Sequence, residues 1–376
     1  MSVRRFAAQG VLLVLVVITL NWMLSQHQSS PEALRRGSGA GAAESIPVSA
    51  AVSASADALP AAAAAAASGP PTASAMCKAA MERLIATQPA TVWPPPCPLP
   101  ADSPLRAAYE GPAGSMPITS DYCFAQRYEG ELVLDWNSAY IDKYCSALAS
   151  GDAQGTYGAV DDMNFRGGLA QVPGLTGSTG MVLGSERPWV ECIALAAGAA
   201  AVWTFEYATI RSTHPQLFAK PTKVMAAESI AGTLPLFDWI ACYSSLEHSG
   251  LGRYGDAINP DADKEALEQA WCLLKPGGFL ILGMPMSCKE DGYIEYNAHR
   301  VYGYRRIAYV AEGFELVAAA YKCEWRKDGS TSMIILRRPT DGSRAPIITL
   351  EAFAAADQRA GVQPAHYCTD GTLCRK

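Results

Sequence analysis

Residues 237–285 read FDWIACYSSLEHSGLGRYGDAINPDADKEALEQAWCLLKPGGFLILGMP, and this stretch predicts the core of the fold. It contains two short apolar runs, at 239–243 and 279–282, and the second follows a KPGG turn at 275–278. Runs without polar alternation are typical of parallel strands that are covered on both faces. Residues 264–274 lie between the runs and carry apolar side chains at helical spacing. The stretch therefore predicts a right-handed strand–helix–strand unit.

The same patterns predict the other elements of the fold. The expected helices cover 76–90, 137–148, 187–197, 227–232 and 308–312. The expected strands cover 181–183, 201–205, 223–226, 314–319 and 332–336. Residues 151–180 read as a glycine-rich loop, and the residues after Pro285 read as a polar, aromatic and basic loop. Strands that alternate with helices and end in a strand pair predict an α/β fold, with a doubly wound, mostly parallel Rossmann-like sheet and a terminal antiparallel strand.

Composition narrows the class of function. The chain has 376 residues, 49% of them hydrophobic, and a formal charge of −6 without a dense basic block, so we expect no nucleic-acid partner. Five scattered histidines do not suggest a histidine-built metal site. None of the 11 cysteines forms a Cys-x-x-Cys pair, which argues against a zinc ribbon or a thioredoxin-type dithiol.

The N-terminus predicts a membrane anchor. Arg4 and Arg5 precede a largely apolar segment at 6–24, which reaches roughly the 20 residues that span a bilayer. No small-x-small cleavage site follows directly, so we expect an uncleaved anchor with a cytoplasmic N-terminus. The chain would then be a single-pass type II membrane protein with most of its mass in the Golgi or ER lumen. A plastid or other organellar targeting segment is the alternative.

Changes in composition divide the chain into segments. Residues 1–28 form the cytoplasmic tip and anchor, and 29–75 form an Ala/Ser/Pro-rich stem that cannot build a core. We expect an N-terminal cap at 76–175, the α/β domain at 176–340 and a C-terminal tail at 341–376.

In an oxidising lumen some cysteines should pair. Cys77 with Cys97, or Cys368 with Cys374, are the local candidates, although spacing alone does not determine connectivity. We interpret Cys242 and Cys272, which lie in apolar runs, as small buried hydrophobic residues.

The quoted stretch also carries a family resemblance. FDWIACYSSLEHSG followed by LKPGGFLILGMP resembles the class I S-adenosylmethionine-dependent methyltransferases, and the order of elements extends this likeness over roughly 181–336. More narrowly, GSERPWVECIALAAGAAAVWTFEY, SSLEHSGLGRYGDAINP and YNAHRVYG are similar to an uncharacterised domain family known chiefly from nematodes and algae. The first resemblance implies S-adenosylmethionine as cofactor, whereas the second adds to the fold and little to the substrate.

The methyltransferase resemblance implies cofactor-binding positions. It places the cofactor beside Gly184 at the end of the first strand, with Glu206 at the tip of the second strand accepting the ribose hydroxyls. An exposed acid that merely ends a strand is the alternative for Glu206. Glu228 would lie near the adenine edge, or would be an ordinary first-turn acid of a helix.

The first loop departs from the family pattern. A Gly-x-Gly-x-Gly loop is expected, but residues 184–189 read GSERPW. Ser185 is expected to cap the following helix and Glu186 to meet the ammonium group of the cofactor. A closed loop would instead leave a methyltransferase-like shell that binds something else or nothing.

Polar residues follow the fourth strand, at the sheet edge where open α/β folds bind ligands. We assign Ser244 to the cofactor, Glu247 to the substrate and His248 to general-base catalysis, since the reference pKa of histidine is near neutral. A capping box formed by Ser244 and Glu247, and a histidine that braces a loop, are the structural alternatives.

The loop after the fifth strand supplies further candidates. His299 is the second catalytic candidate, and Arg300 and Tyr302 would bind the acceptor, because arginines and tyrosines hold sugars or carboxylates. A solvated basic loop is the alternative.

Acidic pairs suggest a different chemistry. Asp261-Ala262-Asp263 has the Asp-x-Asp form that glycosyltransferases use to hold a metal and a nucleotide diphosphate, but it also precedes a helix, where acids are favourable. Asp161-Asp162 is no stronger as a metal motif. We therefore predict no metal.

Taken together, the sequence predicts a methyltransferase for a hydroxyl or carboxylate, acting on a small molecule, a glycan or another secretory product. A Golgi-type metal-dependent glycosyltransferase and a non-catalytic methyltransferase-like binding domain are the alternatives.

Overall fold

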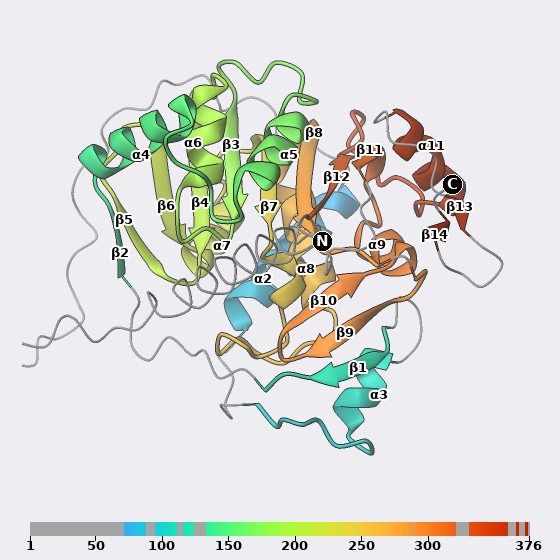
Figure 1. Cartoon of the computed structure of the whole chain (residues 1–376). Helices are drawn as coiled ribbons and strands as arrows, with labels where there is room; N and C mark the ends of the chain where they lie inside the picture. The colour runs from blue at the N-terminus through green and yellow to red at the C-terminus, as the bar shows by residue number, and fades with distance from the viewer. Residues whose placement is uncertain are drawn as a thin grey trace, which may run out of the picture. The chain divides into compact units, whose positions relative to one another are not determined.

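The computed structural model describes residues 71–87, 95–110, 116–123, 133–287, 289–320, 331–359, 366–367 and 373–374 (Figure 1). The helices are α2 (Pro71–Ala86), α3 (Pro104–Glu110), α4 (Ser138–Ser150), α5 (Ala159–Leu169), α6 (Trp189–Ala196), α7 (Thr222–Ala231), α8 (Ala262–Leu273), α9 (Tyr304–Val310) and α11 (Leu350–Arg359), with a 3₁₀ turn η1 (Leu246–His248). The strands are β1 (Ile118–Asp121), β2 (Val133–Trp136), β3 (Thr179–Leu183), β4 (Ala201–Glu206), β5 (Thr209–Ser212), β6 (Leu217–Pro221), β7 (Phe237–Tyr243), β8 (Leu274–Met284), β9 (Gly292–Tyr296), β10 (His299–Tyr302), β11 (Glu315–Ala320), β12 (Ser332–Arg337), β13 (His366–Tyr367) and β14 (Leu373–Cys374).

A seven-stranded mixed sheet organises these elements, in the order β11-β12-β8-β7-β3-β4-β6. The strands from β6 to β8 are parallel, whereas β12 is antiparallel to both β8 and β11. Within this sheet, the chain enters at β3, continues outward to β4 and β6, and returns to β7 on the other side of β3 (Figure 1). This doubly wound order confirms the predicted α/β class and the antiparallel strand, and it places the reversal of winding between β3 and β7.

Both faces of the sheet are covered, which explains the unbroken apolar runs. Successive residues of a strand point to opposite faces, and on β7 Ile240 and Ala241 accordingly belong to two different core clusters. Ile240 packs in the cluster that includes residues of α2, α7, α8 and α9, and Ala241 in the cluster that includes residues of α4, α5 and α6. The buried parallel strands predicted from 239–243 and 279–282 are confirmed.

The prediction of one long loop at 151–180 was wrong, because α5 lies within it. Two glycines near the end of α5 weaken its helix propensity, but the helix buries Phe165 and Leu169 against the core. A Cβ on Gly168 would come within 2.7 Å of the Met333 side chain, so the glycine permits the helix to pack closely on β12. Tertiary packing here overrides local propensity.

Two further predictions were wrong in type or register. The strand predicted at 223–226 lies inside helix α7, and the corresponding strand is β6, which ends at Pro221. The polar segment after Pro285 is not an irregular loop, since it contains the antiparallel pair β9 and β10. Asn297 turns between these strands with a φ of 61°.

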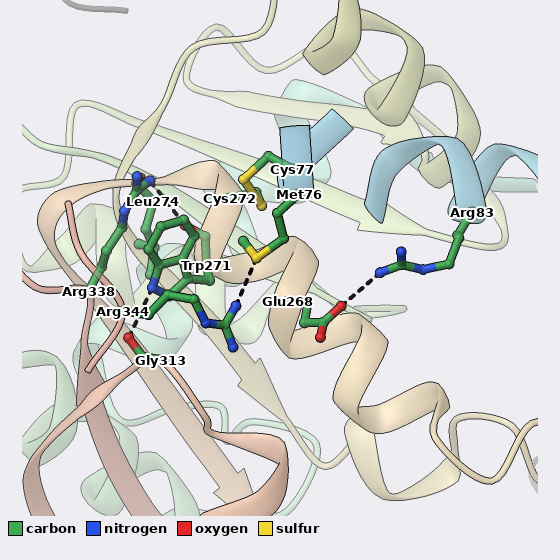
Figure 2. Close-up of a disulfide and its surroundings, with 10 residues drawn as sticks. All are labelled: Met76, Cys77, Arg83, Glu268, Trp271, Cys272, Leu274, Gly313, Arg338 and Arg344. Carbon is green, nitrogen blue, oxygen red and sulfur yellow. Dashed lines mark hydrogen bonds and ion pairs between the residues drawn. A yellow bond between two sulfur atoms is a disulfide. The ribbon is translucent and has the colours of Figure 1, made fainter. Parts of the chain in front are cut away.

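Disulfides join segments that are far apart in the sequence. Cys77 pairs with Cys272, Cys97 with Cys123 and Cys145 with Cys192, so the expected pairing of Cys77 with Cys97 was wrong. Cys272 is therefore not a lone buried hydrophobic residue, whereas Cys242 is a buried free thiol as expected. Figure 2 shows the Cys77–Cys272 bridge, which ties α2 to α8. Cys368, half of the other predicted local pair, lies outside the described residues.

The predicted anchor at 1–28 and nearly all of the predicted stem at 29–75 also lie outside the described residues, and both stay predictions. Within the ranges given above, no helix combines the length and the apolar character that a membrane span requires.

Candidate functional site

A cavity of about 350 Å³ opens at the carboxyl ends of β3, β4 and β7. Its walls include the loop at 184–187, the tip of β4 and the loop after β7, and α2, α7 and α8 contribute apolar side chains. Ligands of open α/β sheets bind where the winding reverses, and the cavity has the size of small-molecule sites. The tertiary structure thus brings together Gly184, Ser185, Glu186, Glu206, Ser244 and His248, all of which the sequence nominated.

Gly184 lets two loops cross at the floor of the cavity. It has a φ of +74°, a conformation that side chains disfavour. A Cβ at this position would lie 2.1 Å from Oγ of Ser245, on the loop after β7. The single remaining glycine of the first loop therefore stands where the backbone requires one.

Glu206 ends β4 and faces the same space. Its Oε2 accepts a hydrogen bond of 2.9 Å from the backbone N–H of Ser185, and Oε1 accepts one of 2.8 Å from the N–H of Tyr207. Burial raises the pKa of this carboxyl group. Each oxygen keeps acceptor capacity, so the group can receive two hydroxyl donors from a ligand.

The loop at 184–187 is held by side chains rather than by glycines. Ser185 is buried, and its Oγ donates to the carbonyl oxygen of Arg187 at 2.9 Å. The expected cap was wrong, because Pro188 is the N-cap residue of α6 and no side chain bonds to the helix end there. Glu186 is exposed and lines the cavity. The loop leaves the cavity open, unlike the closed loop considered as the alternative.

Ser244 and Glu247 bond to each other at the turn after β7. Ser244 has a φ of 50°, and its Oγ donates to Oε1 of Glu247 at 2.7 Å. They do not form a capping box, since Ser245 is the N-cap of η1 and its side chain makes no cap bond. Burial raises the pKa of Glu247, whose Oε2 has no hydrogen-bond partner among the described residues.

His248 lines the cavity, and one hydrogen bond defines its tautomer. Its Nδ1 lies 2.6 Å from the carbonyl oxygen of Ala298, and because a carbonyl only accepts, Nδ1 must carry the hydrogen. Nε2 is then the unprotonated nitrogen of a neutral ring. Burial lowers the pKa of His248 to about 3, so the ring stays neutral at physiological pH.

His299 lies near His248 but does not belong to the cavity wall. Their ring centroids are 6.1 Å apart, and Nε2 of His299 lies 2.8 Å from a carboxylate oxygen of Glu295. Burial lowers the pKa of His299. Its surroundings favour a bracing role beside the site.

Arg300 and Tyr302 are not available to an acceptor, so this prediction was wrong. Both side chains are fully buried. Arg300 donates to the carbonyl oxygen of Ser249 at 2.5 Å, and its Nε lies 3.5 Å from Asp263. Tyr302 donates to Asp263 at 3.3 Å. The pairing with β9 turned these side chains inward, away from the solvent that a loop would face.

Glu228 was also misplaced. It lies in the second half of α7, where Nζ of Lys220 contacts its carboxylate at 2.5 and 2.6 Å, and it does not line the cavity. The error in the register of β6 and α7 caused the error in the residue.

Neighbouring side chains contact acids of both pairs. Asp263 is fully buried and binds Arg306, which also contacts Asp261 at 3.4 Å. Asp161 accepts hydrogen bonds from Tyr243 and Thr331. Throughout the described ranges, no group of three or more His, Cys, Asp or Glu side chains could hold a metal ion.

Aromatic side chains around the cavity were not anticipated. Tyr157, Tyr207 and Tyr254 line it, and Tyr207 is 72% exposed directly after Glu206. Trp189 packs edge-to-face on Tyr243 with ring centroids 4.9 Å apart. The sequence signal that could have identified Tyr207 is an aromatic residue directly after the acid that ends the strand.

Comparison with solved structures gives partial likenesses to methyltransferases. A 1,6-didemethyltoxoflavin-N1-methyltransferase from Burkholderia thailandensis, solved with S-adenosylhomocysteine, is 16% identical, with a TM-score of 0.36, over 53% of this chain and 87% of that one. The N-methyltransferase NodS from Bradyrhizobium japonicum, also solved with S-adenosylhomocysteine, is 16% identical, with a TM-score of 0.30, over 52% and 98%. A search of curated proteins gives no match.

The sequence profile of one family matches the domain. It covers residues 177–335 and is described as Caenorhabditis protein of unknown function, DUF268. The match spans the sheet from β3 to β12 and includes the cavity loops after β3, β4 and β7. Residues 177–335 thus match the model of the DUF268 family, and this range forms the α/β sheet described above.

Proposed function

We propose that this domain binds S-adenosylmethionine in the cavity and transfers its methyl group to an acceptor hydroxyl or carboxylate of a small molecule or glycan. The observation that carries the proposal is the joint placement of Gly184 and Glu206 in one cavity, at the carboxyl ends of β3 and β4 and beside the point where the winding of the sheet reverses. The glycine keeps the floor open, and the acid offers acceptors to a pair of neighbouring hydroxyls.

The residues present fit this cofactor. Glu206 would accept hydrogen bonds from the ribose hydroxyls, the exposed ring of Tyr207 would supply a stacking face for the base, and exposed Glu186 would pair with the ammonium group. Apolar side chains of α7 and α8, including Met225 and Leu273, exclude water from the opposite wall. These side chains are thus complementary to a nucleoside joined to an amino acid.

The chain's part in the reaction is positioning and acceptance of a proton. S-adenosylmethionine supplies an electrophilic methyl group on a sulfonium. Nε2 of His248 accepts a hydrogen bond from the acceptor hydroxyl and takes its proton as the oxygen becomes methylated. A neutral imidazole suffices because an alkylated oxygen that still carries its proton is a strong acid.

Binding tests the proposal directly. We expect the full chain to bind S-adenosylhomocysteine in a calorimetric titration, and Glu206→Ala to weaken binding by about 10- to 100-fold, because charge-assisted hydrogen bonds contribute about 1.5–3 kcal/mol. Glu228→Ala is the matched control, since Glu228 pairs with Lys220 away from the cavity. Absence of binding of either the cofactor or its demethylated product to the wild-type chain would refute the proposal.

Replacement of His248 tests the chemistry. Asparagine keeps a donor toward Ala298 but lacks Nε2, so we expect His248→Asn to leave affinity for S-adenosylhomocysteine unchanged and to reduce transfer of a labelled methyl group by about 10²–10⁴-fold. In this assay, phenols, monosaccharides and simple carboxylates are tried in turn as methyl acceptors. The control variant His299→Asn should retain most of the activity. Equal losses in the two variants would contradict the role of His248 as the general base. If the wild type binds the cofactor but methylates none of these acceptors, a non-catalytic binding domain is favoured.

For the compartment, we propose the secretory lumen behind a type II anchor. Three disulfides among the described cysteines support it, because such bonds persist in oxidising compartments.

A further inference from the structure

The loop at 184–187 has lost the glycines expected of a cofactor loop, so other groups must set its shape. Its backbone is tied at several points: the N–H of Ser185 donates to Glu206, and Nε1 of Trp136 donates to the carbonyl oxygen of Glu186 at 3.4 Å. The carbonyl oxygen of Arg187 accepts from the N–H of Trp189 at 2.8 Å. These bonds restrain the main chain, but the buried side chain of Ser185 is held by something else.

That partner is Glu191, a carboxyl group with no exposed surface on α6. Its Oε1 accepts from Oγ1 of Thr204 on β4 at 2.7 Å. Its Oε2 lies 3.1 Å from Oγ of Ser185, and the same Oγ lies 2.9 Å from the carbonyl oxygen of Arg187. Glu191 thus stands directly behind the loop and bridges it to the neighbouring strand.

The number of available hydrogens determines which protonation state of Glu191 satisfies these contacts. The Ser185 hydroxyl has one hydrogen, and the carbonyl oxygen of Arg187 can only accept. If Ser185 donates to Arg187, the contact between Ser185 and Glu191 needs a hydrogen from Glu191. A protonated Glu191 makes every bond in the series, whereas an ionised Glu191 competes with Arg187 for the single hydroxyl hydrogen.

We propose that Glu191 is a positioning residue. In its protonated form it donates a hydrogen bond to the Ser185 hydroxyl, which in turn donates to the carbonyl oxygen of Arg187. These two bonds hold the cofactor loop in place and keep the Ser185 amide against Glu206. This rests on the proposed function for the identity of the ligand, but the hydrogen-bonded series exists without it. The loop is expected to keep its shape while Glu191 is protonated and to loosen when Glu191 ionises.

The surroundings of Glu191 agree with a neutral acid. Burial is the main cause that raises its pKa, to about 7, and the nearby carboxylate of Glu206 adds to the shift. Tyr144 of α4 interacts electrostatically with Glu191 from the helix that the Cys145–Cys192 disulfide joins to α6. Glu186 lies near Glu206, and Arg187 lies near Tyr144, so both charges belong to the surroundings of this group.

The test compares Glu191→Gln with the wild type in the full chain. Glutamine mimics the protonated acid, because its amide N–H can donate to Ser185 while its oxygen accepts from Thr204. With S-adenosylhomocysteine as the probe, we expect wild-type affinity to fall by about tenfold between about pH 6 and pH 8, as a group with a pKa near 7 ionises. The glutamine variant should bind with the same affinity at both values, and Glu191→Leu should bind weakly at both.

A second measurement needs no cofactor. The infrared carbonyl stretch of a protonated carboxyl group should disappear from the wild type between about pH 6 and pH 8 and be absent from Glu191→Gln. If this band titrates but the wild type binds no S-adenosylhomocysteine, the inference survives and the proposed function fails. If the band does not titrate in this range, or if the glutamine variant shows the wild-type fall in affinity, the inference is wrong.

Discussion

Replacing Asp263 with alanine is expected to lower the free energy of unfolding by about 3–5 kcal/mol, the cost of breaking a buried ion pair by removing one partner. Asp263 is fully buried and is held by two buried guanidinium groups. Nε of Arg306 donates to its Oδ2 at 3.0 Å, and Nε of Arg300 lies 3.5 Å from the same atom. Alanine would take the buried carboxylate away from both guanidinium groups and leave Arg306 with its 3.4 Å contact to the half-exposed Asp261.

The matched control is Asp261→Ala, two residues earlier on the same segment. The Asp261 side chain is 49% exposed and makes one contact of 3.4 Å with Arg306, so we expect a loss of at most about 1 kcal/mol. Denaturant titrations of both variants in the full chain give the comparison. Similar losses, or stabilisation of the wild type by Mn²⁺, would contradict the arrangement and restore the metal interpretation of the Asp-x-Asp pattern.

The pH dependence of this pair has a defined sign. Burial alone would raise the pKa of Asp263, but Arg300 and Arg306 outweigh it, so the folded-state pKa lies below the usual value. A carboxyl with a depressed pKa contributes stability above its unfolded-state pKa and loses it as pH falls through the folded-state value. The stability difference between wild type and Asp263→Ala should therefore shrink in acid.

Removing the Cys77–Cys272 disulfide should affect both stability and binding. We expect the double variant Cys77→Ser/Cys272→Ser to lose about 2–5 kcal/mol of unfolding free energy, as is usual for a native disulfide. The bridge joins α2 to α8, and Leu84 of α2 and Leu273 of α8 line the cavity. We therefore also expect weaker binding of S-adenosylhomocysteine.

Other contacts hold α2 in place in that variant. Arg83 pairs with Glu268 at 2.8 Å, and Nη1 of Arg344 lies 2.9 Å from the sulfur of Met76 (Figure 2). The loss of affinity should thus be partial. Calorimetric titration and thermal unfolding measure the two effects.

A second disulfide supplies the control for binding. Cys97→Ser/Cys123→Ser removes a bridge with a sequence separation of 26, compared with 195 for Cys77–Cys272, and neither of its cysteines lines the cavity. Its stability loss should be smaller, because shorter closed loops restrict the unfolded chain less, and its affinity should be unchanged. Equal affinities in the two double variants would show that the Cys77–Cys272 bridge does not support the cavity wall.

Where local sequence carried the information, prediction succeeded. The runs at 239–243 and 279–282 are apolar on every residue because both faces of the sheet are covered, and this marked β7 and β8 without reference to the rest of the chain. Glu206 and Gly184 were predicted from the methyltransferase resemblance, and the structure places both at the cavity. Their roles in binding stay predictions.

Where a long-range partner decides the outcome, prediction failed. Arg300 and Tyr302 look like exposed loop residues until β10 pairs with β9 and Asp263 is placed beside them. Helix α5 could not be recognised because its glycines oppose helix formation and packing against the core compensates.

The sequence by itself thus determined the α/β class and the buried strands β7 and β8, because hydrophobic periodicity is a local signal. Only the tertiary structure decided the disulfide pairing, the burial of Asp263 and the contact of Glu191 with Ser185. Each of these depends on which surfaces meet, and burial then sets the energy of the charged and polar groups involved. The stretch at 237–285 consequently predicted the fold, whereas the loop at 184–187 acquires its meaning only from the carboxyl group packed behind it.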